Sequence, residues 1–170
     1  MYWETPSDKD VLQGDWLPNC LVAKHPDRFT PDTQQEALLD EYDLIVITQS
    51  CDLANHKAQF VAMCPIFTLA ECSKAIPVFA NNGKREELRK GRVEGLHLLA
   101  SPTDPQDNQK ALVVDFREIY SLPIEYVLGH AAELGERWRL RSPYLEHFSQ
   151  AFARFFMRVG LPSAIPSYKS

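Results

Sequence analysis

The sequence predicts a mainly β fold with helices, a small antiparallel barrel closed by a C-terminal amphipathic helix. Three observations lead to this class: several short apolar or alternating runs separated by turn residues, one charged helix inserted among them, and a strongly amphipathic helix near the end. A chain of 170 residues with 45% hydrophobic content can close one core. We therefore expect a single domain over 1–170, with the barrel at about 11–141 and the terminal helix at about 143–159.

The first half supplies the predicted meander at the centre of the sheet. Residues 11–17 form an apolar run around a Gly-Asp turn and predict an edge strand or the start of a strand, whereas the polar, proline-containing stretch 24–40 predicts a loop. Residues 43–51 are apolar on both faces before Thr48, which predicts a central strand covered on both sides. Residues 59–67 follow at hairpin distance as its antiparallel neighbour.

The second half alternates helices with shorter strands. Helix formers between two glycines predict a solvated helix in 81–92. The remaining expected elements are strands at 95–99, 111–120 and 137–141, a turn-rich loop at 101–108 and a short helix at 124–134. Ser142 can cap the terminal helix, Pro143 suits its first position, and Gly160 ends it. Its phenylalanines recur at helical spacing, so one face should pack on the sheet.

Composition limits the class of protein. We find no apolar stretch of 18 residues and no signal-peptide pattern, so we expect a cytoplasmic protein without a membrane partner. The net charge is −5, with 5 basic against 12 acidic residues in 1–80 and 13 against 11 in 81–170. Overall acidity argues against a general nucleic-acid binder, but it leaves room for a local basic patch in the second half.

The order of these pieces resembles the MazF/PemK toxin family. That family has an SH3-like barrel with a Gly-Asp strand start, a long apolar strand ending in a small hydroxyl residue, a strand ending in Pro-Ile, and a late acidic strand before a short helix. The corresponding pieces here are Gly14-Asp15-Trp16, 44–50, 61–66, 113–117 and 122–128. The resemblance implies an SH3-like barrel that can form a homodimer. It also implies RNA cleavage by an Arg in the first loop and a strand-end hydroxyl, which would be Arg28 with Thr48 or Ser50.

Two longer motifs resemble a second group, bacterial proteins of unassigned activity. They are TQSCDL at 48–53 and SPYLEHFSQAFARFFMRVGLP at 142–162. This resemblance implies an accessory protein of a toxin-antitoxin or phage-defence type locus. The first function hypothesis is accordingly a MazF-like barrel that binds nucleic acid, RNA or DNA, or a protein partner encoded nearby. The alternative is a MazF-like endoribonuclease.

Polar and reactive groups gather at the end of the predicted central strand. The candidate pocket residues are Gln49, Ser50, Cys51 and Asp52. In a strand, Thr48, Ser50 and Asp52 would share one side. A purely structural interpretation is that these residues end the strand and turn the chain, with Cys51 as a small buried hydrophobe.

Cys51 supports two further alternatives. As a thiolate nucleophile it needs a neighbouring base, His56 or His97. As a zinc ligand it needs converging partners, for which Cys64 and His56 are the main candidates and Cys72 and Cys20 the others. The four cysteines lack CxxC pairs and are expected to be reduced thiols, so no metal is favoured and zinc remains an alternative.

A basic run lies in the predicted helix of the second half. Its cations are Lys84, Arg85, Arg89, Lys90 and Arg92. The ordinary interpretation is a solvated helix face, supported by Glu86 and Lys90 at four-residue spacing. The sharper hypothesis is a phosphate-contacting patch for RNA or DNA. The terminal helix also carries a polar stripe that we interpret as its water-facing side: His147, Gln150, Arg154 and Arg158.

Overall fold

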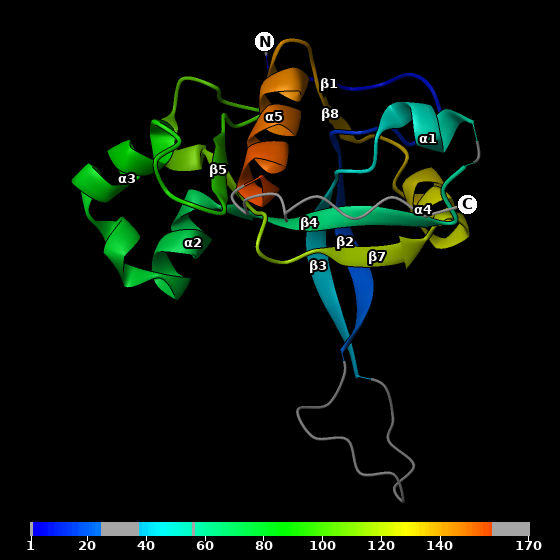
Figure 1. Ribbon diagram of the computed structural model, residues 1–170, viewed down its shortest axis with the longest axis horizontal. Helices are drawn as coiled ribbons and strands as arrows, with labels where there is room; N and C mark the ends of the chain where they lie inside the picture. The colour runs from blue at the N-terminus through cyan, green and yellow to red at the C-terminus, as the bar shows by residue number, and fades with distance from the viewer. Residues whose placement is uncertain (1, 25–37, 56, 158–170) are drawn as a thin grey trace, which may run out of the picture.

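An eight-stranded antiparallel sheet forms the frame of the molecule (Figure 1). The computed structural model describes residues 2–24, 38–55 and 57–157. Its strands are β1 (Trp3–Glu4), β2 (Asp15–Lys24), β3 (Leu38–Val46), β4 (Phe60–Thr68), β5 (Leu96–Leu99), β6 (Leu112–Asp115), β7 (Tyr120–Pro123) and β8 (Trp138–Leu140). The order is β1-β8-β2-β3-β4-β6-β5, with β7 also paired to β4. A mainly β fold with helices is confirmed, but the sheet in the described part of the chain is open.

Helices cover the two ends and one face of this sheet. They are α1 (Ser50–Ala54), α2 (Leu69–Ala75), α3 (Asn82–Arg89), α4 (Ile124–Leu134) and α5 (Tyr144–Phe156), with short 3₁₀ turns η1 (Pro77–Ala80) and η2 (Asn108–Lys110). Figure 1 shows α2 and α3 at one end, α1 and α4 at the other, and α5 between them. None of the helices in the described ranges is long and apolar enough to cross a membrane.

Strand β3 has the central position that its composition predicts. Leu44, Ile45 and Val46 are fully buried, and β3 lies between β2 and β4. The expected strand at 43–51 is nevertheless wrong at its end, because the ladder stops at Val46 and Ser50 begins a helix. The N–H groups of Ile47 and Thr48 both donate to the Ala62 carbonyl, so the one-to-one register with β4 is lost at this point.

Beyond the body of the sheet, β2 and β3 continue as a two-stranded ribbon, which we call the arm (residues 20–24 and 38–42; Figure 1). The ends of the predicted loop 24–40 are therefore strand, since Lys24 pairs with Leu38. Arg28 lies outside the described residues. Of the two alternatives for 11–17, the start of a strand is confirmed, because β2 begins at Asp15. Strand β2 is not an edge, because it also pairs with β8.

The predicted strand at 111–120 is divided in two by a turn. The Asp115 carboxylate accepts hydrogen bonds from the Arg117 backbone N–H at 2.9 Å and from Arg117 Nε at 2.8 Å. This local pairing turns the chain between β6 and β7, which bind successive segments of β4. The alternation of polar and apolar residues continues across this turn, so the pattern alone predicts one strand where the structure has two.

Helix α2 was not predicted, although its start carries a recognisable signal. Thr68 and Glu71 form a capping box: the Thr68 hydroxyl accepts from Glu71 N–H, and the Glu71 carboxylate accepts from Thr68 N–H at 2.8 Å. Hydrogen bonds from Thr68 hold the pKa of Glu71 below its usual range. The helix therefore begins where the β4 ladder ends.

We expect Thr68→Ala to lower the free energy of unfolding by about 1 kcal/mol, because the first turn of α2 loses its cap. Urea unfolding followed by circular dichroism measures this change. Thr5→Ala, at an exposed position outside any helix, is the matched control and should be neutral. An equal effect of the two substitutions would contradict a stabilising cap.

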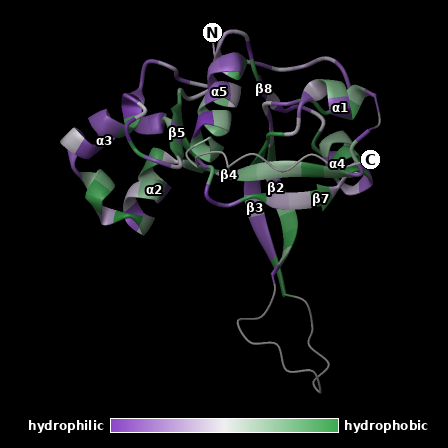
Figure 2. Ribbon diagram, viewed as in Figure 1, coloured by the Kyte–Doolittle hydropathy of each residue, from purple (hydrophilic) through white to green (hydrophobic). Residues whose placement is uncertain are grey.

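The apolar face of α5 packs on the sheet, as its periodicity predicts. Phe148 is fully buried against Ile45 and Val114, and Phe152 and Phe155 extend the same cluster. Figure 2 shows α5 divided between hydrophilic and hydrophobic residues. A second core cluster joins Cys20 and Val22 of β2 to helix α4, and a third lies beneath α2 and α3. The hydrophilic side of α5 is thereby left for other contacts.

Candidate functional site

The hydroxyl groups at the end of β3 serve the local fold. Thr48 Oγ1 accepts a hydrogen bond from the Ala62 N–H at 2.7 Å. Ser50 Oγ accepts one from the Gln13 N–H at 3.1 Å, and the Gln13 amide reaches the Ile47 carbonyl at 3.0 Å. These bonds fix the turn from β3 into α1. Ser50 and Asp52 thus lie on one turn of helix and not on the side of a strand.

Cys51 is exposed on α1, unlike the other three cysteines. Its sulfur lies 3.7 Å from Gln49 Oε1 and 3.9 Å from Asp52 Oδ1, so its nearest polar neighbours are oxygens and not a cation that would stabilise a thiolate. Of the two candidate bases, His97 lies on β5 and His56 is outside the described residues. Within 2–24, 38–55 and 57–157, the polar contacts of Cys51 therefore include no group that would activate the thiol.

The zinc alternative needs ligands that converge. Burial raises the pKa of the Cys64 thiol to about 12, and Cys64 lies in the core cluster under α5. Among the described residues, no group of three or more His, Cys, Asp or Glu side chains could hold a metal ion. Residues 49–52 also line none of the three main hollows of the surface. Helix α1 contributes only Leu53 and Ala54 to one of these hollows.

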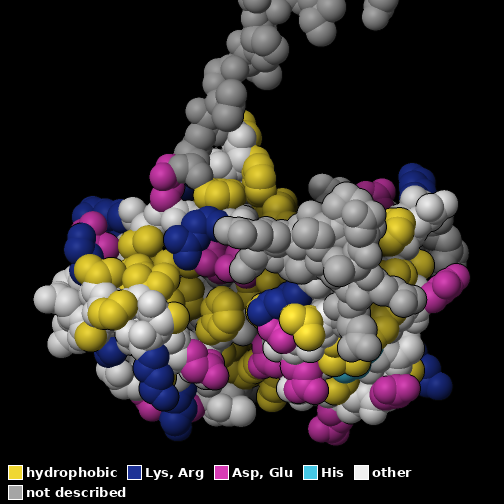
Figure 3. All heavy atoms as spheres, turned by 90° about the horizontal axis from the view of Figure 1, so that it is seen from below, with side chains coloured by type: hydrophobic (Ala, Val, Ile, Leu, Met, Phe, Trp, Pro, Cys, Tyr) yellow, Lys and Arg dark blue, Asp and Glu magenta, His cyan; other side chains and the backbone are white. Residues whose placement is uncertain are grey.

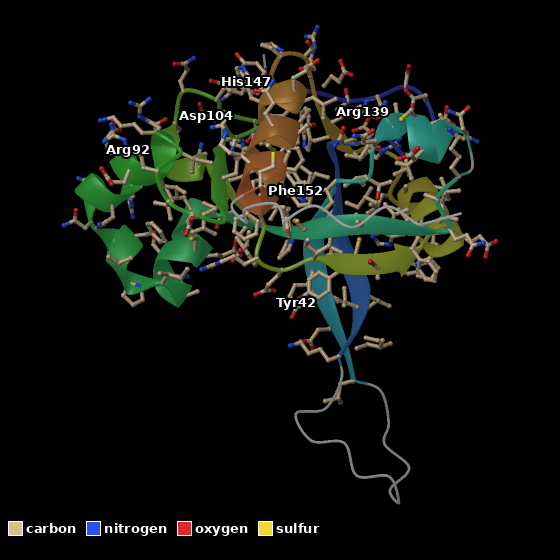
Figure 4. The ribbon with its side chains drawn as sticks, viewed as in Figure 1. Tyr42, Arg92, Asp104, Arg139, His147 and Phe152 are labelled. Atoms are coloured by element: carbon tan, nitrogen blue, oxygen red, sulfur yellow. The ribbon has the colours of Figure 1, made fainter. Side chains whose placement is uncertain are left out.

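The largest of these hollows, about 480 Å³, lies between the C-terminal end of α3, strand β5 and helix α5. We call it the α3–α5 groove. Its polar lining is Arg89, Lys90, Glu94, His97, His147, Gln150 and Arg154, and its apolar lining includes Leu96, Phe116 and Phe155. His147 lies near the start of α5, and Figure 4 labels it together with Phe152 further along the same helix.

One wall of the groove holds two cations side by side. Arg89 donates to both carboxylate oxygens of Glu86 at 2.7 Å, and Lys90 Nζ lies 3.2 Å from the same carboxylate. The hydrogen bonds from Arg89 and then Lys90 lower the pKa of Glu86 to about 2. One carboxylate thus anchors two cations on this wall, and Glu94 is a further acidic residue in the lining of the groove.

The opposite wall is the polar stripe of α5. Arg154 is exposed and makes no ion pair with another described residue, and His147 and Gln150 lie on the same side of the helix. We expected this stripe simply to face water, but three of its members line the groove; Arg158 lies outside the described residues. Two polar features far apart in the sequence thus face one hollow.

An imidazole that stays neutral lies in the floor of the groove. His97 stacks on Phe116, with ring centroids 5.8 Å apart, and lies 5.9 Å from the Phe148 ring. Burial and, to a smaller extent, the charge of the nearby His147 together lower the pKa of His97 to about 4. At neutral pH this ring can take part in hydrogen bonds without adding charge.

The other cations of the basic run do not line the groove. Arg85 folds back on the chain, where its Nε donates to the Phe79 carbonyl at 2.6 Å and its Nη1 to Gln109 at 3.0 Å. Arg92 pairs with Glu87 at 3.6 Å, and Lys84 is exposed on α3. The predicted patch is therefore divided: Arg89 and Lys90 face the groove, and the remainder is structural or solvated.

A buried ionic network, which the sequence analysis missed, lies elsewhere in the sheet. Asp15, at the start of β2, is fully buried and ion-paired to Arg137 and Arg139, which precede and lie within β8. Both guanidinium groups also donate to the Asp10 carbonyl, and Arg139 reaches Asp8 (Arg139 in Figure 4). Every charge in the network has a partner. Because Asp8 and Asp10 belong to the N-terminal segment, these bonds hold that segment against the sheet.

No protein-family model, curated protein or solved structure matches this chain. The function is accordingly inferred from the groove and its charges.

Proposed function

We propose that this chain is a nucleic-acid-binding module, a MazF/PemK-like barrel of a bacterial toxin-antitoxin or phage-defence type locus, and that its α3–α5 groove holds the phosphates. One observation carries the proposal: Arg89 and Lys90 from one element and Arg154 from another line the same hollow. Convergent cations are the usual means by which proteins neutralise a nucleic-acid backbone.

The chemistry of the groove fits this ligand. Glu86 fixes the positions of the Arg89 guanidinium, through its Nε and Nη2 atoms, and of the Lys90 ammonium. The remaining N–H groups of these two cations can form charge-assisted bonds to phosphate oxygens. A volume of about 480 Å³ suits one nucleotide unit better than a duplex. The rings of His97 and Phe155 line the same hollow, and bases stack on such rings in single-strand binding proteins.

The barrel part of the proposal draws on the order of the strands. The meander β2–β3–β4 begins at a Gly-Asp pair, and the β4 sequence ends in Pro-Ile-Phe-Thr, in line with the family resemblance. Strand β4 binds β3 along one part and β7 and β6 along others, as in a strongly curved sheet. No cleavage site is included, because the strand-end hydroxyls of Thr48 and Ser50 accept backbone hydrogen bonds.

We expect the wild-type chain to bind a fluorescein-labelled single-stranded RNA of about 12 nucleotides at about 50 mM salt, and Arg89→Ala/Arg154→Ala to weaken binding at least tenfold. The slope of log affinity against log salt should also become shallower, by about 1 to 2. Fluorescence anisotropy over a salt series measures both quantities. A labelled DNA strand of the same sequence tests the choice between RNA and DNA.

Lys84→Ala/Arg92→Ala is the matched control, since it removes the same charge from residues outside the groove. If both double variants lose affinity equally, the attraction is diffuse and the groove is not the site. Denaturing gels of the same RNA samples separate the alternative activity: cleavage that is lost in Ser50→Ala would identify an endoribonuclease instead.

A further inference from the structure

One face of the arm carries exposed apolar side chains. Leu21 pairs with Glu41 and Ala23 with Leu39, so these four residues share a face. Leu21 is 43% exposed and Leu39 60% exposed, whereas Val22 on the opposite face is buried in the core. Figure 3 shows hydrophobic side chains gathered where the arm leaves the body. No described residue covers this face.

A hollow of about 380 Å³ continues this face onto helix α4. Leu21 and Glu41 line it from the arm, and Glu125, Gly129 and Glu133 line it from α4. These three α4 positions are spaced by four residues and therefore form one stripe of the helix. We call the combined surface of these five residues with Leu39 the arm–α4 face.

Gly129 leaves the floor of this hollow open. It lies inside α4, its φ is not positive, and a Cβ atom added to it would meet nothing within 4 Å. Neither the backbone conformation nor internal packing therefore requires glycine, although glycine destabilises a helix interior relative to alanine. The absent side chain leaves room for a group from outside the chain to approach the helix backbone.

Three carboxylates surround this opening without internal neutralisation. Glu41, Glu125 and Glu133 are exposed, and none makes an ion pair with another described residue. The two rings beside them are both bound to strand β2: Leu21 N–H donates to the Tyr126 hydroxyl at 2.6 Å, and His130 Nε2 lies 2.7 Å from the Pro18 carbonyl. The carboxylates also belong to no group that could hold a metal ion, in the described part of the chain.

We propose that the arm–α4 face docks a basic, amphipathic segment of another protein. Lysine or arginine side chains of that segment meet Glu41, Glu125 and Glu133, while its apolar side chains cover Leu21 and Leu39 and enter the space over Gly129. Charge complementarity selects this occupant, because acidic groups around an apolar strip attract cations and repel acidic partners. This surface is separate from the α3–α5 groove, and the inference does not rest on nucleic-acid binding.

A phage-displayed library of random peptides of about 12 residues, selected on the wild-type chain and depleted on Gly129→Arg, tests the proposal. The arginine of this variant fills open space, so the fold is retained, and a thermal melt verifies this. We expect the selected peptides to combine Lys or Arg with Leu, Ile or Phe. Labelled copies should bind the wild type at least tenfold more tightly than Gly129→Arg, Leu39→Ser or Glu125→Gln/Glu133→Gln.

Matched controls use the same chemistry at other places. Glu136→Gln and Val78→Ser remove an exposed carboxylate and an exposed apolar side chain outside this face, and both should leave peptide affinity unchanged. Failure to enrich cationic peptides, or equal affinity for wild type and Gly129→Arg, overturns the proposal. So does a dimer, measured by light scattering, that Leu39→Ser and Gly129→Arg dissociate, because the occupant would then be a second copy of this chain.

Discussion

Replacing Asp15 by alanine is expected to lower the free energy of unfolding by about 3 to 5 kcal/mol. The Asp15 carboxylate is fully buried; it accepts from Arg137 Nε at 2.9 Å and from Arg139 Nη2 at 3.0 Å. Removing it leaves two guanidinium groups in the interior with only the half-exposed Asp8 and the Asp10 carbonyl as partners. The penalty arises from these uncompensated charges and exceeds the net value of the intact network.

Urea unfolding at neutral pH measures this loss, with Arg141→Ala as control. Arg141 pairs with Glu4 at 3.3 Å, and both side chains are about half exposed, so breaking that pair should cost less than 1 kcal/mol. A triple variant, Asp15→Leu with Arg137→Met and Arg139→Met, should recover most of the stability, because no unpaired charge remains. If Asp15→Ala behaves like Arg141→Ala, the buried network does not stabilise the fold as argued.

Acidification is expected to remove about 2 to 3 kcal/mol of stability through His97 alone. Burial lowers the pKa of His97 to about 4, whereas an unfolded chain titrates it near 6.5. Between these values the unfolded state binds the proton and the folded state does not, so protons favour unfolding. The contribution of His97 is therefore complete above pH 6.5 and is lost as the pH falls through 4.

Comparing unfolding free energies at pH 7, 6, 5 and 4 isolates this effect. His97→Phe keeps a ring beside Phe116 and Phe148 but has no proton to bind, so its stability should fall less steeply than that of the wild type. His147→Gln, at an exposed position, is the control and should retain most of the wild-type slope. Parallel curves for wild type and His97→Phe would show that other groups govern acid unfolding.

Long, strongly patterned segments were readable from the sequence. Strand β4 and helices α3, α4 and α5 lie within two residues of their expected starts. The predictions were wrong where local side-chain hydrogen bonds decide the backbone conformation. Asp115 bonds Arg117 and turns the chain inside an alternating segment, and Thr68 caps a helix directly after a strand. Both are local hydrogen-bonding effects to which periodicity is insensitive.

The candidate site was only partly readable, because it depends on contacts between distant segments. The basic run was recognised, yet its division into groove-lining and internal cations follows from where Phe79 and Glu86 lie. The stripe of α5 joins that run only because Phe148 orients the helix on the sheet. The alternation Arg137-Trp138-Arg139 likewise did not show that both arginines point inward. They bind the Asp15 carboxylate, which lies more than 100 residues away in the chain.

Strand β4 has a consequence for how the molecule comes apart. It pairs with β3, with β7 and with β6, so it is the only described strand shared by the half of the sheet that carries the arm and the half that carries α2 and α3. Val61, Met63 and Cys64 are fully buried along it. Displacing β4 breaks the pairing of both halves at once, so a disturbance of this strand in either half is felt in the other.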